Sequence, residues 1–125
     1  MDTLQLLSQE PLLPIFIGGS ISLKKLAEFM GINHSVLAQI IQRDVRTVER
    51  DAASESVLKR LQPLIYALKM LLELTNGNQD EVQRWLREPL IEWRGASPLD
   101  YLTADRIDAV VNLVERIYYA DSAGY

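Results

Sequence analysis

The sequence predicts an all-α protein, and three observations support this prediction. Apolar residues recur at spacings of three and four through most of the chain, as they do on one face of a helix. Residues that cap helices stand before several of these stretches. No segment alternates apolar and polar residues for long enough to predict a strand. With 125 residues, of which 48% are hydrophobic, the chain can bury one core, as a single domain or as two small lobes that share it.

The first 20 residues are expected to form an arm. Its apolar stretch Ile15-Phe16-Ile17 is too hydrophobic to lie in water alone, and Pro11 and Pro14 interrupt the apolar run. Two interpretations stay open: the arm folds onto the chain's own core, or it crosses to a second subunit.

Three short helices are expected between residues 22 and 52. Ser22 and Asp44 stand at N-cap positions, and Gly31 stands where a glycine commonly ends a helix. The three helices are expected over residues 23–30, from residue 34 or 35 to 42, and over 45–52.

A long helix is expected from Ser54 or Ser56 to about Thr75, with a wide face of leucine and isoleucine. Pro63 lies inside it. A proline inside a helix removes a hydrogen bond and costs roughly 3 kcal/mol. The sequence therefore predicts that this helix is interrupted, with a break or bend near Gln62.

A corner between two short helices is expected over residues 85–102, which hold two tryptophans, a tyrosine, two prolines and a glycine. The first helix should end before Pro89, because proline disfavours the helical conformation of the preceding residue. Gly95 supplies a turn, and Ser97-Pro98 has the residues of a helix start. The large side chains here are expected in the core: Trp85, Leu86, Trp93, Tyr101 and Leu102.

The last helix carries the cleanest amphipathic pattern in the chain. Thr103 is expected to cap it, and Asp105 suits the helix dipole near its start. The tail from Tyr119 to Tyr125 contains serine and glycine, and is expected to be mobile or ordered by a partner. The apolar face of the helix is formed by Ile107, Val110, Val111, Val114, Ile117 and Tyr118.

The composition argues against an enzyme and against a metal or cofactor site. The chain has no cysteine, which excludes disulfides and thiolate zinc sites and fits a reducing compartment. Its single histidine, His34, cannot form a histidine metal site and is expected at a helix start. The glycines form no phosphate-binding loop. No apolar run approaches the ~18 residues of a membrane span, and no signal peptide is visible, so a cytoplasmic protein is expected.

Charge is distributed unevenly along the chain, whose net charge is −4. Residues 34–60 carry five basic and four acidic residues and form the only part with a positive balance. Residues 88–125 carry three basic and seven acidic residues. Any contact with DNA must therefore depend on a few well-placed arginines or on a dimer.

The three short helices indicate a helix-turn-helix, in either of two registers. In the first register, the helices over 23–30 and 34–43 form the pair, and the second presents His34, Ser35, Gln39 and Gln42. In the other, the helices over 35–42 and 45–52 form the pair, and DNA would meet Arg43, Arg46, Thr47 and Arg50. We favour this second register, because Arg46 and Arg50 share a helix face and arginine binds phosphate or guanine. The competing interpretation is a solvated face with salt bridges to Asp44, Glu49 or Asp51.

The combined pattern resembles the MbcA/ParS/Xre antitoxin family, whose members are partners of RES-domain toxins. The resemblance covers about residues 30–120. Upstream, the residues that resemble the family's Xre-type helix-turn-helix, in the second register, are Leu37-Ala38, Arg46-Thr47-Val48 and Arg50. The corner carries the clearest part of it, in Trp85-Leu86, Pro89, Gly95, Pro98, Asp100 and Leu102, before the amphipathic last helix.

The resemblance implies a non-enzymatic antitoxin that binds a NAD-consuming RES-type toxin, and a homodimer that represses its own operon. Taken together with the expected helices and arm, the chain is expected to have three parts: an N-terminal arm (1–20), a helix-turn-helix with its connecting helix (21–75) and a small helical toxin-binding lobe (76–125). The toxin contacts it implies are Trp85, Leu86, Pro89, Trp93, Gly95, Pro98, Tyr118, Tyr119, Asp121 and Tyr125. Two alternatives stay open: a stand-alone helix-turn-helix transcription regulator without a toxin, and an adaptor that has lost DNA binding.

Overall fold

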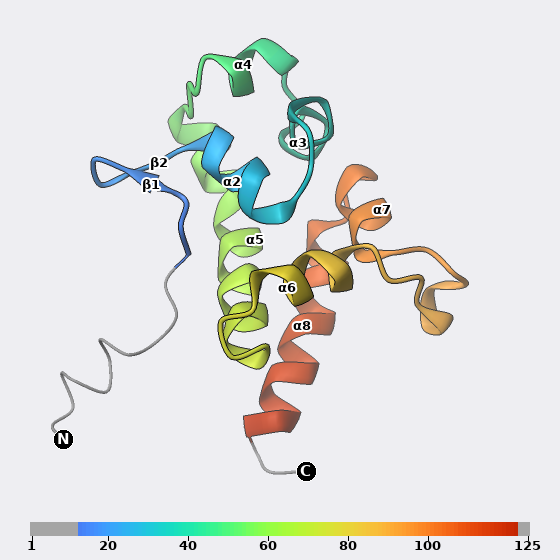
Figure 1. Cartoon of the computed structure of the whole chain (residues 1–125). Coiled ribbons are helices and arrows are strands. Elements are labelled where there is room, and N and C mark those ends of the chain that lie inside the picture. The colour runs from blue at the N-terminus through green and yellow to red at the C-terminus, as the bar shows by residue number, and fades with distance from the viewer. Residues whose placement is uncertain (1–12, 123–125) are drawn as a thin grey trace, which may run out of the picture.

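The computed structural model describes the backbone of residues 13–122 and the side chains of residues 13–120. Most of the described residues lie in helices, and the only strands among them are two of two residues each, which confirms the all-α prediction (Figure 1). Its elements are β1 (Phe16–Ile17), β2 (Ser20–Ile21), α2 (Leu23–Met30), α3 (His34–Ile41), α4 (Val45–Glu49), α5 (Glu55–Leu74), α6 (Gln79–Leu86), the 3-10 helix η1 (Ile91–Trp93), α7 (Pro98–Thr103) and α8 (Ile107–Ser122).

Capping side chains determine where the first helices begin and end, as the sequence predicts. The Ser22 hydroxyl and the Asp44 carboxylate accept backbone N–H groups at the starts of α2 and α4. Gly31 ends α2 in the left-handed conformation, with a φ of 68°. The helix α4 is shorter than expected and ends at Glu49, because Asp51 takes a left-handed φ of 54° and turns the chain.

The helix α5 runs unbroken through Pro63, so the predicted break near Gln62 is wrong. The proline still lacks the N–H that a helix interior uses. Leu61 before the proline and Leu64 and Leu68 after it are completely buried, and their packing holds the helix in place. Tertiary packing supplies most of a helix's stability in a protein, and here it overrides the local preference of proline.

One hydrophobic core extends through the molecule, with α5 at its centre (Figure 1). The helix α8 lies along most of α5, from Arg60 and Pro63 to Glu73, and α6 and α3 also pack against α5. The helices α2 and α4 pack against α3 and against each other. The buried side chains form a single cluster, whose members range from Leu13 to Val114 in the sequence. The N-terminal and C-terminal helices therefore share one core. No helix in the described part of the chain is both long enough and apolar enough to cross a membrane.

The residues before the hairpin pack against the chain's own core. Leu13 and Ile15 are buried, and the Ser22 N–H donates to the Ile15 carbonyl at 2.8 Å. For residues 13–15 this favours the first of the two interpretations of the arm. The rest of the arm, residues 1–12, lies outside the described residues.

A short β-hairpin, which the sequence did not predict, follows these residues. Its two strands pair antiparallel, with Phe16 opposite Ile21, and they are too short to show an alternating pattern. Gly18 and Gly19 form the turn with φ angles of 56° and 83°, as a two-residue hairpin turn requires. The hairpin leaves Phe16 and Ile17 exposed at its tip.

The helix α7 begins as predicted, and α8 does not. Ser97 and Asp100 form a capping box, in which each side chain accepts the other's backbone N–H. Thr103, expected to cap the last helix, is instead the final residue of α7, and α8 begins at Ile107. The Thr103 hydroxyl donates to the Leu99 carbonyl at 3.2 Å, a bond inside a helix that competes with capping the next one.

Side chains from α6 and from the residue that follows it cap the C-terminal end of α2. Gln83 Nε2 donates to the Phe29 carbonyl at 3.0 Å, and the Arg87 guanidinium donates to the Gly31 carbonyl. The last carbonyls of a helix have no partner within that helix and need one from elsewhere. The first and last thirds of the chain are therefore joined by polar contacts as well as by the core.

Replacing Pro63 with alanine should stabilise the protein. The Pro63 side chain is exposed, and alanine restores the missing N–H donor in the interior of α5. The free energy of unfolding in urea should rise by about 2 kcal/mol, after allowance for the greater freedom of the unfolded chain. Gln62→Ala, at the neighbouring exposed position, should change it little. A less stable Pro63→Ala variant would show that the proline ring itself supports the fold.

Candidate functional site

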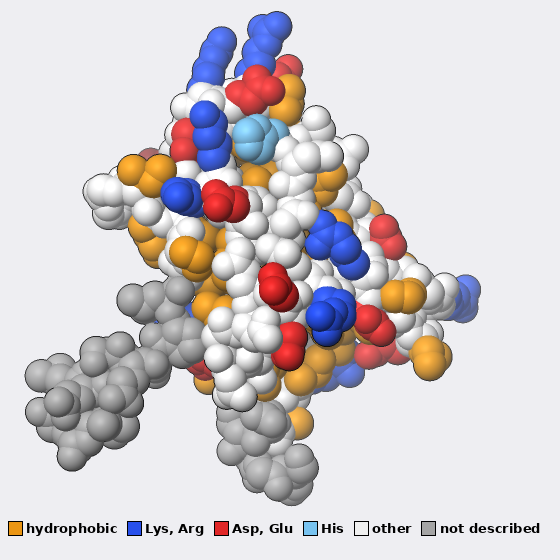
Figure 2. Space-filling model, in the orientation of Figure 1, with side chains coloured by type: hydrophobic (Ala, Val, Ile, Leu, Met, Phe, Trp, Pro, Cys, Tyr) orange, Lys and Arg blue, Asp and Glu red, His pale blue; other side chains and the backbone are white. Residues whose placement is uncertain are grey.

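The four residues predicted to meet DNA lie at one end of the molecule, on α4 and beside it. The side chains of Arg43, Arg46 and Arg50 are exposed, and that of Thr47 is half-exposed. On the opposite side of α4, Val48 is completely buried in the core. Lys and Arg side chains project from the end of the molecule that carries α4 (Figure 2). The acidic side chains of Asp44 and Glu49 are exposed at the N-cap and the end of the same helix, so the surface carries charges of both signs.

The salt bridges of the competing interpretation are not found among residues 13–120. No ion pair there involves Arg46 or Arg50. Asp44 instead accepts the backbone N–H of Arg46 at 2.9 Å as the cap of α4. Arg43 donates to Ser56 Oγ at 3.0 Å, which holds this arginine against the start of α5.

Asp51 ties the end of α4 to the start of α2. Its carboxylate accepts the Ser22 hydroxyl through one oxygen and the Leu23 N–H through the other. The Ser22 hydroxyl oxygen in turn accepts the Lys25 N–H at 3.1 Å. Since α4 has only five residues, this contact with α2 and the buried Val48 determine its orientation.

The turn between α3 and α4 forms without a glycine. Gln42 takes the left-handed conformation there, with a φ of 56°, and its N–H donates to the Gln39 carbonyl at 3.2 Å. A left-handed residue other than glycine costs roughly 1–2 kcal/mol. The packing of α3 against α4 and α5 must therefore support this turn.

The corner residues divide between core and surface. Leu86, Pro98 and Leu102 are buried, whereas Trp85 and Trp93 are half-buried. The Trp93 ring stacks on the ring of Tyr101, with centroids 4.0 Å apart and planes within 9°. Pro89 and Gly95 are exposed. The prediction that the large corner side chains form the core is thus fully met only at Leu86 and Leu102.

An apolar groove lies beside Trp85, between the end of α5, α6 and α8. Its volume is about 430 Å³. Ile117 of α8 faces the groove and is 39% exposed, although the helical pattern predicts it on the buried face. Such a groove leaves apolar surface available to a partner. The residues that line it are Leu71, Leu74, Thr75, Glu81, Arg84, Trp85, Glu88 and Ile117.

Tyrosines attach the C-terminal end of α8 to α5. The Tyr118 hydroxyl donates to the Glu73 carboxylate at 2.6 Å, and the hydroxyls of Tyr66 and Tyr119 lie 3.2 Å apart. The hydrogen bond with Tyr119 raises the pKa of Tyr66 above its usual value. Asp121 lies within α8, but its side chain is outside the described residues, and Tyr125 is outside them altogether.

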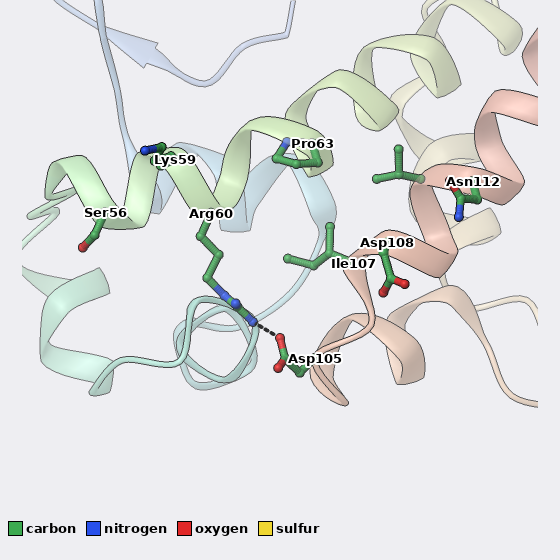
Figure 3. Close-up of a pocket in the computed structure, with 9 residues that line it drawn as sticks. Ser56, Lys59, Arg60, Pro63, Asp105, Ile107, Asp108 and Asn112 are labelled. Atoms are coloured by element: carbon green, nitrogen blue, oxygen red, sulfur yellow. Dashed lines mark hydrogen bonds and ion pairs between the residues drawn. The ribbon is translucent and has the colours of Figure 1, made fainter.

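A second, more polar groove lies where α5 passes the start of α8, with a volume of about 670 Å³ (Figure 3). Across this groove the Arg60 guanidinium pairs with the Asp105 carboxylate. Arg60 Nε also donates to the Ile40 carbonyl at 3.0 Å. The Arg60 guanidinium lowers the pKa of Asp105, and Arg106 lowers that of Asp108. Both carboxylates are therefore charged at neutral pH, and neither can act there as a general acid.

No cluster of three or more metal-binding side chains occurs in the described part of the chain. Three features there were not identified from the sequence: the contact of Asp51 with α2, the contacts of Arg60, and the exposed Ile91 of η1. The contact of Asp51 with Leu23 joins residues 28 positions apart, and that of Arg60 with Ile40 joins residues 20 positions apart. Helical spacing cannot predict contacts over such separations. Ile91 could have been noticed, because it belongs to neither of the flanking helical patterns.

The comparison with protein families finds a match in the C-terminal part of the chain. Residues 70–120 match the family model of the antitoxin Xre/MbcA/ParS C-terminal toxin-binding domain. The match spans the end of α5, α6, the corner, α7 and nearly all of α8. It supports an antitoxin role with a toxin as partner, and this domain family is not a family of enzymes. No curated protein and no solved structure matches the chain.

Proposed function

We propose that this chain is the antitoxin of a type II toxin–antitoxin pair, that its toxin is a RES-type protein that consumes NAD, and that a homodimer of the chain represses its own operon. The match of residues 70–120 to an antitoxin toxin-binding domain carries the antitoxin role. The resemblance of the corner and of α3 and α4 to the family supports the RES-type partner and the DNA-binding activity.

The surface proposed to bind the toxin is formed by the apolar groove beside Trp85, which we call the α6–α8 groove, and by the C-terminal end of α8. The groove offers apolar area beside Trp85 and Ile117, which a partner can cover. Residues 88–125 have a net charge of −4, which suits a basic surface on the toxin. Complementary charge of this kind speeds association more than it raises affinity.

Neutralisation by this surface requires no chemistry from the antitoxin. The contacts of Tyr118 with Glu73 and of Tyr119 with Tyr66 fix the direction in which α8 leaves the core. In our proposal the chain that follows, with Asp121 and Tyr125, enters the toxin's substrate cleft and blocks it. Inhibition then depends on occupying the cleft and not on unfolding the toxin.

The proposed DNA contact uses the exposed face of α4 and the residue before it. Arg43, Arg46, Thr47 and Arg50 would meet the phosphate backbone and base edges of the major groove. A homodimer would place two such helices on half-sites separated by about 34 Å, one turn of DNA. Because α4 and the described end of α8 lie at opposite ends of the molecule (Figure 1), operator and toxin could be bound together.

Replacing Arg46 and Arg50 together with alanine should abolish operator retention and leave toxin inhibition intact. Both side chains are exposed, and no ion pair involves them among the described residues, so the fold should not change. The measurement is a gel shift on the upstream DNA at several salt concentrations. The loss should exceed tenfold at physiological salt, and any residual binding should depend less steeply on salt.

The matched control is Arg84→Ala with Arg94→Ala, which removes the same charge from exposed positions on α6 and after η1. Both positions adjoin the surface proposed to bind the toxin, so this control is compared for operator binding alone. It should bind operator like the unmodified chain. Equal losses in both double variants would contradict a specific role for α4, and loss of both operator binding and toxin inhibition would indicate unfolding.

Deleting residues 121–125 should weaken inhibition of the toxin without preventing its capture. The deletion keeps the corner, the groove and the contacts of Tyr118 and Tyr119. The unmodified chain should stop NAD consumption by the purified RES-type protein, and the shortened chain should form the complex but leave activity. Unchanged inhibition by the shortened chain would remove the tail from the mechanism.

A further inference from the structure

One large hydrophobic side chain is exposed far more than the others in the described part of the chain. Ile91, the first residue of η1, is 97% exposed. The other exposed large hydrophobic residues there range from 39% to 57%. Ile91 lies in the corner loop, which we define as residues 87–96, between α6 and α7.

The backbone of the corner loop is closed by its own hydrogen bonds. The Leu90 N–H donates to the Ala96 carbonyl at 3.0 Å, which joins the residue before η1 to the last residue of the loop. The Leu90 carbonyl accepts the N–H groups of Trp93 at 3.1 Å and Gly95 at 2.8 Å. Ile91 therefore lies in a segment whose backbone conformation is fixed by these hydrogen bonds.

Two side-chain contacts fasten this loop to the rest of the molecule. The Trp93 ring stacks on Tyr101 of α7. Glu92 pairs with Arg116 of α8, with 3.4 Å between the carboxylate oxygen and the guanidinium nitrogen. Arg94 takes a left-handed φ of 57°, a conformation that costs energy unless its surroundings enforce it. The loop is thus held in one shape before any partner arrives.

The chain's own fold does not explain an isoleucine at position 91. A single exposed apolar residue is common on protein surfaces. Here, however, the side chain is almost fully solvated, so a polar residue at this position would cost the fold nothing. Because the surrounding loop is held by these contacts, it keeps the exposed Ile91 side chain at one position on the surface.

The corner loop also adjoins the α6–α8 groove. Glu88, in the first turn of the loop, lines that groove. The pair between Glu92 and Arg116 brings the loop to α8 beside Ile117, which lines the groove from the other side. All of these residues fall within the segment that matches the toxin-binding domain. A partner that covers the groove would meet the loop next.

We propose that Ile91 is an anchor of the complex, which inserts into an apolar pocket on the toxin while the groove receives a neighbouring part of the same protein. The inference rests on the proposed function. The pocket should fit one branched aliphatic side chain and should have a basic rim, because residues 88–125 are acidic. A rigid loop loses little freedom on binding, which is the condition under which one side chain contributes strongly to affinity.

The test compares Ile91→Ser with Ile17→Ser, which makes the same change at the other strongly exposed isoleucine, on the hairpin and outside the matched segment. The probe is the purified RES-type protein that the proposed function assigns as the partner of this chain, and calorimetry measures the Kd. Ile91→Ser should weaken binding at least tenfold, and Ile17→Ser should leave it unchanged. Ile91→Leu should stay within about threefold of the unmodified chain, and the Tm of all three variants should not move.

Each other outcome overturns a distinct part of the account. If the unmodified chain does not bind the RES-type protein, the proposed function and this inference both fail. If the unmodified chain and Ile91→Ser bind equally, only the anchor fails. Equal weakening by Ile17→Ser would show a general effect of lost hydrophobicity, and a lower Tm for Ile91→Ser would show a role in folding; either result overturns the anchor.

Discussion

The burial of α5 from both sides is the interaction on which the rest of the structure depends. Its three completely buried leucines, Leu61, Leu64 and Leu68, belong to a core that α2, α3, α6 and α8 share. Burying such a side chain contributes roughly 2 kcal/mol, and here the burial is sufficient to keep a helix continuous through Pro63. Because one helix supports both ends of the molecule, the surface on α4 and the surface on α6 and α8 are held in a fixed relation.

Polar contacts strengthen this relation at the points where helices end. Gln83 and Arg87 bond carbonyls at the C-terminal end of α2, and Arg60 bonds a carbonyl of α3 while it pairs with Asp105. The segment that matches the toxin-binding domain thus packs against helices outside the match. A partner that displaced α6 or the start of α8 would disturb α2 and α3, which would link toxin binding to the end of the molecule proposed to bind DNA.

The comparison of sequence and structure shows which physical effects can be read locally. The capping residues Ser22, Gly31, Asp44 and Ser97 were identified correctly, because a cap involves only neighbouring residues. The errors at Pro63 and Thr103 arose where packing or a competing local bond decided the outcome. At the candidate site, exposure of the arginines followed from helical spacing. The closed corner loop and its exposed isoleucine depend on contacts with α7 and α8, which spacing does not reveal.

The central claim is that the corner loop and the C-terminal half of α8 face the toxin while α4 stays free for DNA. Hydrogen exchange of the full chain, with and without the purified RES-type protein, tests it most directly. The account predicts that the toxin slows exchange of the backbone amides over residues 88–93 and 113–119, with little change over 43–50. Slower exchange confined to residues 43–50, or no change anywhere in the chain, would contradict it.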